Sequence, residues 1–268
     1  MKTKNRIIKF SAAFLLITAI LASCNKDVPL TGIELDKVNC EIMVGADLNL
    51  AVIFTPVDAT NKNILWESGN TDVATVNNGI VRGVSLGKAI IKATSEENSS
   101  LQATCEVTVV PSNGQQITVS GDLTADTRWY ANARYFLSGF VYVKNNATLT
   151  IEPGTIIKGV SGTKGALIIE RGSKIIAQGT QTRPIVFTSD KPKGQRSYGD
   201  WGGLVICGNA PTNKHDNGAG VGIAEGGIGS VYGGNNPSDN SGILQYVRIE
   251  FPGIPLTATA NSEINGLT

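Results

Sequence analysis

Histidine, methionine and net charge are all scarce in this sequence. Its 268 residues include one histidine and two methionines, aromatic residues fill only 6% of positions, and the formal net charge is +1. A nearly neutral chain lacks the excess of Lys and Arg that neutralises phosphates, so nucleic acid is not an expected partner. The single histidine, His215, has no second ligand at metal-binding spacing, so we expect an exposed side chain and no metal site.

Common enzyme signatures are missing as well. The sequence contains no nucleophile elbow, P-loop, Cys-x-x-Cys pair or dinucleotide fingerprint. We therefore assign no catalytic residue and expect no cofactor. These absences favour a binding or structural protein over an enzyme.

Long hydrophobic runs are limited to the N-terminus. Basic residues from Lys2 to Lys9 precede an apolar run from Phe10 to Leu21, and small residues then lead to Cys24. The run is shorter than the roughly 20 residues that a spanning helix needs, and the layout is that of a signal peptide over residues 1–23. The ending Leu21-Ala22-Ser23-Cys24 resembles the lipobox of bacterial lipoproteins, which implies cleavage before Cys24 and lipidation of its thiol. An ordinary signal peptide with an incidental cysteine is the alternative.

The lipobox resemblance implies a membrane as partner. Two or more acyl chains hold a protein stably at a bilayer, so the protein is expected in the cell envelope as an outer-membrane lipoprotein exposed at the surface. Residues 24–30 form a short lipidated tether. The rest of the chain is rich in glycine, threonine, valine and isoleucine without helical periodicity, which predicts an all-β fold.

Residues 31–110 show short strand patterns at the spacing of a small sandwich. The strings that begin at Thr55-Pro56-Val57-Asp58, Leu65-Trp66-Glu67-Ser68 and Asp72-Val73-Ala74-Thr75-Val76 resemble the bacterial immunoglobulin-like group 2 (BIG2) domain. The resemblance implies an Ig-like β-sandwich that acts as a spacer. Trp66 is expected to fill the space between the sheets, and Asn78-Gly79 suits a hairpin turn that needs positive φ.

The three remaining cysteines leave alternatives open. Cys40 and Cys105 lie near the first and last strands of the Ig-like segment, so they form either a disulfide or two buried thiols. Cys207 lies in an apolar strand pattern and is expected in the core.

Residues 111–116 form a linker, and residues 117–268 contain a recurring unit. Leu149-Thr150-Ile151-Glu152-Pro153-Gly154 is echoed 18 positions later (149 to 167) by Leu167-Ile168-Ile169-Glu170-Arg171-Gly172. Short strands repeated with glycine turns predict a right-handed parallel β-helix in which these two units stack and Leu149, Ile151, Leu167 and Ile169 point inward. The segment also resembles β-helical repeats of Bacteroidetes-type surface lipoproteins through strings such as Asp200-Trp201-Gly202-Gly203-Leu204-Val205-Ile206. Because a new strand pattern begins shortly before Thr268 without a polar cap, the β-helix is expected to be incomplete at the C-terminus, or its open edge to be covered by another chain.

Two insertions in the β-helix hold the candidate ligand-binding residues, because loops on a rigid scaffold often carry function. The first, from Ser189 to Asp200, contributes five of them: Asp190, Lys193, Arg196, Tyr198 and Asp200. The second, from Asn213 to Asn240, contributes Tyr232 together with the carboxylates of Asp216, Glu225 and Asp239. Trp201, flanked by glycines, is expected to be structural.

The sequence therefore predicts a lipid-anchored surface protein whose Ig-like spacer presents a β-helix for adhesion or for binding a glycan or another macromolecule. The first alternative is a carbohydrate-active enzyme, a polysaccharide lyase or hydrolase, that uses the Ser189 to Asp200 loop. The second is a purely structural surface component.

Overall fold

The computed structural model describes residues 27–216, 218–225, 227–254 and 264–268. The predicted signal peptide and Cys24 lie outside these residues. Within them the protein is all-β, as expected, and its one helical element is the short 3-10 turn η1 (Ser161–Thr163). The described part of the chain contains no helix long and apolar enough to cross a membrane.

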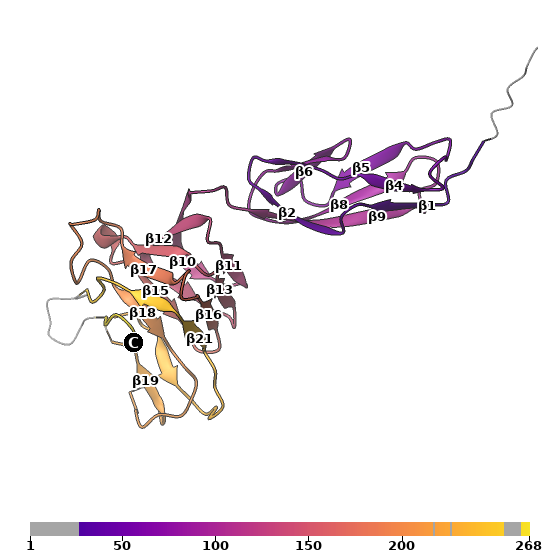
Figure 1. Ribbon diagram of the computed structural model, residues 1–268. Helices are drawn as coiled ribbons and strands as arrows, with labels where there is room; N and C mark the ends of the chain where they lie inside the picture. Colours follow the sequence, from indigo (N-terminus) through magenta and orange to yellow (C-terminus); the bar gives the residue numbers. More distant parts are fainter. Residues whose placement is uncertain (1–26, 217, 226, 255–263) are drawn as a thin grey trace, which may run out of the picture.

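The N-terminal module is an Ig-like sandwich of nine strands (Figure 1). Strands β2, β9, β8 and β5 form one sheet in that order, β3, β7 and β6 form a second, and β1 pairs with β4. A buried core that includes Leu50, Ile91 and Val107 lies between them. The strands are β1 (Gly32–Leu35), β2 (Asn39–Met43), β3 (Asp47–Asn49), β4 (Val52–Thr55), β5 (Ile64–Ser68), β6 (Ala74–Asn77), β7 (Ile80–Gly83), β8 (Gly87–Ser95) and β9 (Gln102–Val110).

The predicted hairpin turn is confirmed, whereas Trp66 is only partly enclosed. Asn77 pairs with Ile80, which leaves Asn78 (φ 48°) and Gly79 (φ 80°) as a two-residue loop with both residues at positive φ. That combination is the I′ turn, which matches the twist of the flanking strands. Trp66 packs against the buried core but keeps part of its side chain exposed at one edge of the sandwich.

The two cysteines of the sandwich lie on neighbouring strands. Cys40 is on β2 and Cys105 on β9, and their sulfur atoms are 3.7 Å apart as free thiols. An S–S bond requires about 2.05 Å. The disulfide stays a prediction for the protein after export.

The C-terminal module is a parallel β-helix, as predicted. Its strands are β10 (Gln115–Leu123), β11 (Thr127–Trp129), β12 (Ala133–Val143), β13 (Thr148–Ile151), β14 (Ile156–Gly159), β15 (Ala166–Ile169), β16 (Lys174–Gln178), β17 (Ile185–Ser189), β18 (Gly203–Ile206), β21 (Gly242–Gln245) and β22 (Val247–Ile249). Gly121 and Gly139, both at positive φ, divide the long strands β10 and β12 between two faces. The pairings therefore define three faces, and each complete rung contributes one strand, or one half of β10 or β12, to each face.

Inward side chains stack from rung to rung. On the first face, Ile117, Tyr135, Ile157, Phe187 and Ile249 occupy one continuous row of paired positions on β10, β12, β14, β17 and β22. Leu149, Ile151, Leu167 and Ile169, which were predicted to point inward, are all at most 2% exposed. The buried rows supply the hydrophobic core of the module.

The predicted stacking of the 18-residue units on each other is wrong. Leu149 lies on β13 and pairs with Ile175 on β16, whereas Leu167 lies on β15 and pairs with Val141 on β12. At these positions the rung partners are therefore 26 residues apart (149 to 175, 141 to 167), whereas the spacing between other rungs differs. The two units look alike because each consists of an inward-facing strand that ends in a glycine turn, but they belong to different faces.

Two long insertions interrupt the rung that contains β17, β18 and β21. Residues 190–202 join β17 to β18, and residues 207–241 join β18 to β21. The second insertion contains an antiparallel hairpin, β19 (Val221–Ile223) and β20 (Val231–Gly233). Cys207, at the start of this insertion, is buried in the core as expected, and His215 is exposed.

Candidate functional site

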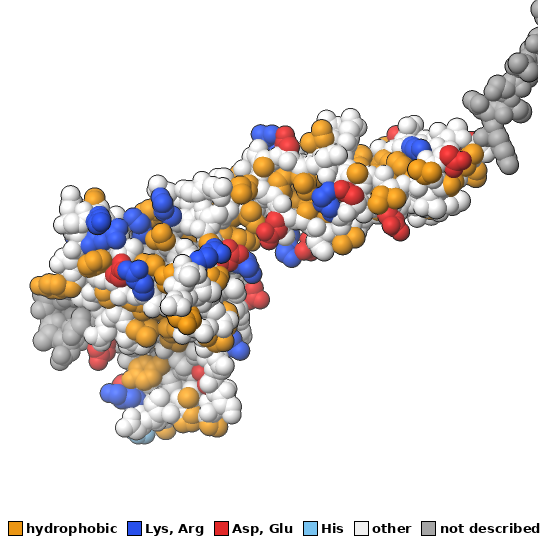
Figure 2. Space-filling view, in the orientation of Figure 1, with side chains coloured by type: hydrophobic (Ala, Val, Ile, Leu, Met, Phe, Trp, Pro, Cys, Tyr) orange, Lys and Arg blue, Asp and Glu red, His pale blue; other side chains and the backbone are white. Residues whose placement is uncertain are grey.

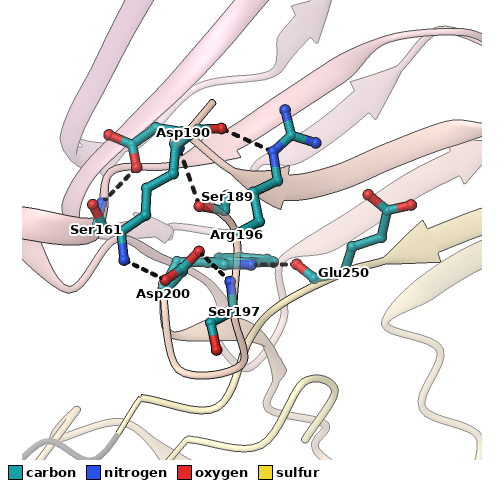
Figure 3. A network of polar contacts seen from close by, with 9 residues as sticks. Ser161, Ser189, Asp190, Arg196, Ser197, Asp200 and Glu250 are labelled. Carbon is teal, nitrogen blue, oxygen red and sulfur yellow. Dashed lines mark hydrogen bonds and ion pairs between the residues drawn. The ribbon is translucent and has the colours of Figure 1, made fainter. Parts of the chain in front are cut away.

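Asp200 is a structural anchor of the first insertion (Figure 3). Its carboxylate is 2.6 Å from Lys191 Nζ and accepts a hydrogen bond of 3.0 Å from the Ser197 backbone amide. Burial raises the pKa of Asp200, but the hydrogen bonds from Lys191, Ser189 and Ser197 outweigh it and keep the pKa below its usual value. The residue is only 4% exposed, so its carboxylate is occupied by the loop itself.

The other residues predicted from this loop fall into different places. Asp190 Oδ1 accepts a hydrogen bond of 3.1 Å from the Ser161 backbone amide, which ties the loop to η1. Lys193 is exposed at the tip, and Tyr198 is 89% exposed without a ring partner among the described residues. The structure therefore does not gather the five predicted residues into one site.

Trp201 has the structural role expected of it. Its side chain is completely buried, its indole Nε1 donates a 2.8 Å hydrogen bond to the Glu250 carbonyl, and its ring stacks on Phe187. No side chain larger than hydrogen fits at Gly159, because a Cβ there would lie 2.4 Å from the Cβ of Trp201. Trp201 thus fixes the end of the loop against the first face of the solenoid.

Arg196 is the one predicted residue of this loop that joins a larger site. Its Nε donates to the Lys191 carbonyl at 2.8 Å, and its Nη1 lies 3.4 Å from Thr188 Oγ1, so the guanidinium is held over β17. There it lines a groove of about 270 Å³ on the outer surface of the first face. The remaining lining residues are Arg134, Ile156, Lys158, Val186, Thr188 and Glu250.

The rung register explains why these residues meet. Arg134 on β12 pairs with Ile156 on β14, which pairs with Val186 on β17; one step along, Lys158 pairs with Thr188. Alternation turns all of these side chains outward, since their neighbours form the buried rows. Below, "basic groove" means the cleft formed by Arg134, Lys158 and Arg196 with the residues between them.

Positive charge is crowded in the basic groove. Burial lowers the pKa of Lys158, the charges of Arg196 and Arg134 lower it further, and the charge of Asp190 offsets these effects only in part. None of the three cations forms an ion pair within the described residues, because Glu250 is paired with Arg248 and Lys158 Nζ lies over the Phe136 ring at 5.6 Å. Figure 2 shows Lys and Arg side chains gathered over the β12 and β17 side of the β-helix. An anionic ligand would relieve this repulsion.

Tyr232 lines a separate pocket under the second insertion. The pocket measures about 480 Å³ and lies between β18 and the β19–β20 hairpin. Its floor is apolar, with Val205, Ile206 and Cys207, and its rim carries Lys214, Asp216 and Glu225. Asp239 lies outside it, where its carboxylate accepts from the Asn209 amide at 2.8 Å. Two of the predicted carboxylates therefore share one pocket with Tyr232.

Sequence reasoning missed Arg134 and Lys158. Both lie on regular strands rather than in insertions, and only the rung register places them beside Arg196. A signal was nevertheless present, because each is a basic residue at an outward position next to an inward aromatic or aliphatic one (Tyr135 and Ile157). Because the true spacing between rungs was not known from the sequence, the two basic residues could not be assigned to neighbouring rungs.

Comparison with known proteins defines the class of the chain. The bacterial Ig-like domain (group 2) model matches residues 29–107, and the pectate-lyase-like beta helix domain model matches residues 121–268. The second match covers more than half of the chain. The protein belongs to the pectate-lyase-like beta helix domain family and carries an N-terminal group 2 Ig-like domain.

Individual relatives share shorter stretches. Two uncharacterized proteins of Clostridium acetobutylicum are each 31% identical, one over 91 residues (34% of this chain and 9% of that protein) and one over 81 residues (30% and 20%). A 3-O-alpha-D-galactosyl-alpha-L-arabinofuranosidase of Bifidobacterium longum is 38% identical over 76 residues, 28% of this chain and 7% of that enzyme. The chain thus spans a fifth or less of each of these three relatives.

Proposed function

We propose that this protein is a lipid-anchored surface protein of the bacterial cell envelope that binds an anionic glycan in the basic groove, with the Ig-like module as a spacer. This proposal rests on one observation: Arg134, Lys158 and Arg196 lie together on one outer face and form no ion pair among the described residues. Carboxylates are the natural partners of such cations, because charge-assisted hydrogen bonds are about twice as strong as neutral ones.

A glycan is favoured over other anions by two further points. The family is described as pectate-lyase-like, and one relative is named as a glycosidase. The groove also crosses β12, β14 and β17 in succession, so a linear polymer could lie across several rungs. Hydrolysis by a pair of carboxylates is disfavoured at this groove, because Asp200 is enclosed by its own loop and Glu250 is paired with Arg248.

Affinity electrophoresis in gels that contain polygalacturonate tests this proposal. We expect the wild-type protein to be retarded, and the Arg134→Gln/Lys158→Gln variant to bind about tenfold or more weakly, since each hydrogen bond to a charged group contributes about 1.5–3 kcal/mol. Lys174→Gln is the matched control, because Lys174 is exposed on β16 of the third face. Equal retardation of the wild type and both variants would show that the glycan binds outside the basic groove. If no acidic or neutral polysaccharide retards the wild-type protein, the remaining hypothesis is a purely structural surface component.

A second candidate function rests on the hairpin pocket. Asp216 and Glu225 line the same pocket as Tyr232, and glycoside hydrolysis requires two carboxylates flanking a sugar bond. An assay for new reducing ends on a panel of neutral glycans tests this function. Activity that disappears in both Asp216→Asn and Glu225→Gln would establish a hydrolase at this pocket. Its absence from the wild-type protein would dismiss the candidate.

A further inference from the structure

The Ig-like module contains a cleft at its open edge. Strand β4 pairs only with β1, and β5 pairs only with β8, so one edge of each strand lacks a neighbour in the described sheets. The two strands lie near each other in Figure 1, and a cleft of about 540 Å³ opens between them. It is lined by Leu50, Val52, Phe54, Lys62, Asn63, Ile64, Trp66, Asn78 and Glu96.

Two aromatic side chains form part of its wall. Phe54 and Trp66 point from β4 and β5 toward the inside of the sandwich, yet both stay partly exposed. Lys62 Nζ lies over the Phe54 ring at 5.7 Å, and Gly79 contributes no side chain beside the Trp66 ring, where a Cβ would lie only 3.1 Å from Cζ2. The Gly79 backbone therefore packs closely on one edge of the indole, and a side chain at this position would crowd the ring.

The polar groups of the cleft are largely uncommitted. The side-chain amides of Asn63 and Asn78 and the carboxylate of Glu96 take part in no hydrogen bond or ion pair within the described residues, whereas Lys62 Nζ donates to the Val57 carbonyl at 2.6 Å. One cation and one anion give the lining no net charge. The cleft thus offers apolar ring surface beside free amide and carboxylate groups, in contrast to the basic groove.

We propose that this cleft is a binding site for a neutral hexopyranose chain. A pyranose has an apolar C–H face, which packs on aromatic rings, and a rim of hydroxyls, which pair with amides and carboxylates. The absence of net charge favours an uncharged sugar over the acidic polymer proposed for the β-helix. The module then contributes a second contact to glycan in addition to its spacing role, and the site stands independently of the basic groove.

Tryptophan fluorescence gives a selective readout of this cleft. Trp129 and Trp201 are 2% and 0% exposed, so Trp66 is the tryptophan that a ligand can reach. We expect cellohexaose or mannohexaose to quench or blue-shift the emission of the purified protein saturably. An unchanged emission with both sugars overturns the proposal.

Variants that keep Trp66 identify the site. Asn63→Ala/Glu96→Ala removes two polar partners and is expected to weaken the interaction about tenfold, since a hydrogen bond contributes about 0.5–1.5 kcal/mol. Leu65→Ala is the matched control: Leu65 is 56% exposed and faces the opposite side of β5. Undiminished binding by the double variant overturns the assignment. So does sedimentation of the wild-type protein as a dimer that the double variant no longer forms, since a second copy of the chain would then cover the cleft.

The Arg134→Gln/Lys158→Gln variant separates the two proposals. Its binding of neutral sugar should equal that of the wild-type protein, because those residues belong to the β-helix. Loss of neutral-sugar binding in that variant would place both ligands in the basic groove and overturn the separate site.

Discussion

Substitution of Gly159 tests how the first insertion is fixed to the solenoid. A methyl group at Gly159 would lie 2.4 Å from Cβ, 2.6 Å from Cγ and 2.7 Å from Cδ2 of Trp201. These separations are about 1 Å or more below ordinary carbon contacts of roughly 3.5–4.0 Å, so the indole or the strand must move. Trp201 is fully buried, stacks on Phe187 and donates to the Glu250 carbonyl, and it therefore cannot rotate away freely.

The expected cost combines two effects. Overpacking of a buried site destabilises by about 1–3 kcal/mol, and weakening the indole hydrogen bond adds about 1 kcal/mol. The total of about 2–4 kcal/mol corresponds to a fall in Tm of about 5–15 °C for a module of this size. Differential scanning calorimetry should show this fall in the β-helix transition, with the Ig-like transition unchanged.

Gly162→Ala is the control for the loss of a glycine. A Cβ at Gly162, in η1, meets nothing within 4 Å and its φ is not positive, so its Tm should stay within about 2 °C of wild type. If the Tm of Gly159→Ala falls no further than the Tm of Gly162→Ala, the close packing of Trp201 on β14 does not fix the insertion, and the prediction is wrong.

Three more predictions address Asp200, the cysteines and the N-terminus. Asp200→Asn should destabilise the β-helix by about 1–2 kcal/mol at pH 7, since it removes a charge partner from Lys191. The folded-state pKa of Asp200 is lowered, so its stabilisation is present above the usual carboxyl pKa and is lost as pH falls through the folded value; the wild-type advantage in urea unfolding should therefore shrink below about pH 4. A constant difference between pH 7 and 3 would contradict that assignment. In the reduced native protein, iodoacetamide should modify Cys40 before Cys105, because Cys105 is fully buried and burial raises the pKa of its thiol to about 12; equal labelling of the two thiols, or labelling of Cys105 first, in mass spectrometry of digests would contradict this prediction. Cys24→Ser should abolish incorporation of a palmitate analogue and release the protein from the membrane fraction, while Ser23→Ala, which keeps a small residue before the cysteine, should not; persistent labelling of Cys24→Ser would dismiss lipidation there.

Local patterns were sufficient to predict much of the architecture. The alternation around Leu149 and Leu167 requires inward apolar rows, and both residues are buried. The Asn78-Gly79 pair predicts a turn with positive φ, because asparagine and glycine tolerate that conformation best, and the β6–β7 hairpin has it. Such signals depend on neighbours in the chain, so they can be read without coordinates.

Long-range relations could not be obtained in the same way. Two units 18 residues apart look like successive rungs, yet pairing places Leu149 over Ile175 and Val141 over Leu167, because strand and turn look similar on every face. The candidate loop likewise seemed to hold a site of five residues. Hydrogen bonds commit Asp190 to η1 and Asp200 to the loop itself, and they leave Arg196 to meet residues from two other rungs.

The sequence alone determined that a small β-sandwich is followed by a solenoid, since hydrophobic alternation and turn residues act over a few positions, and the resemblance of its motifs to the BIG2 domain implied that the sandwich is Ig-like. Tertiary structure alone decided which charges share a surface, because Arg134, Lys158 and Arg196 come together only through strand pairing between rungs of unequal length. Tertiary structure also decided that Trp66 borders an open cleft. The side chain would be enclosed if other strands paired with the free edges of β4 and β5, and strand pairing is a property of the assembled sandwich.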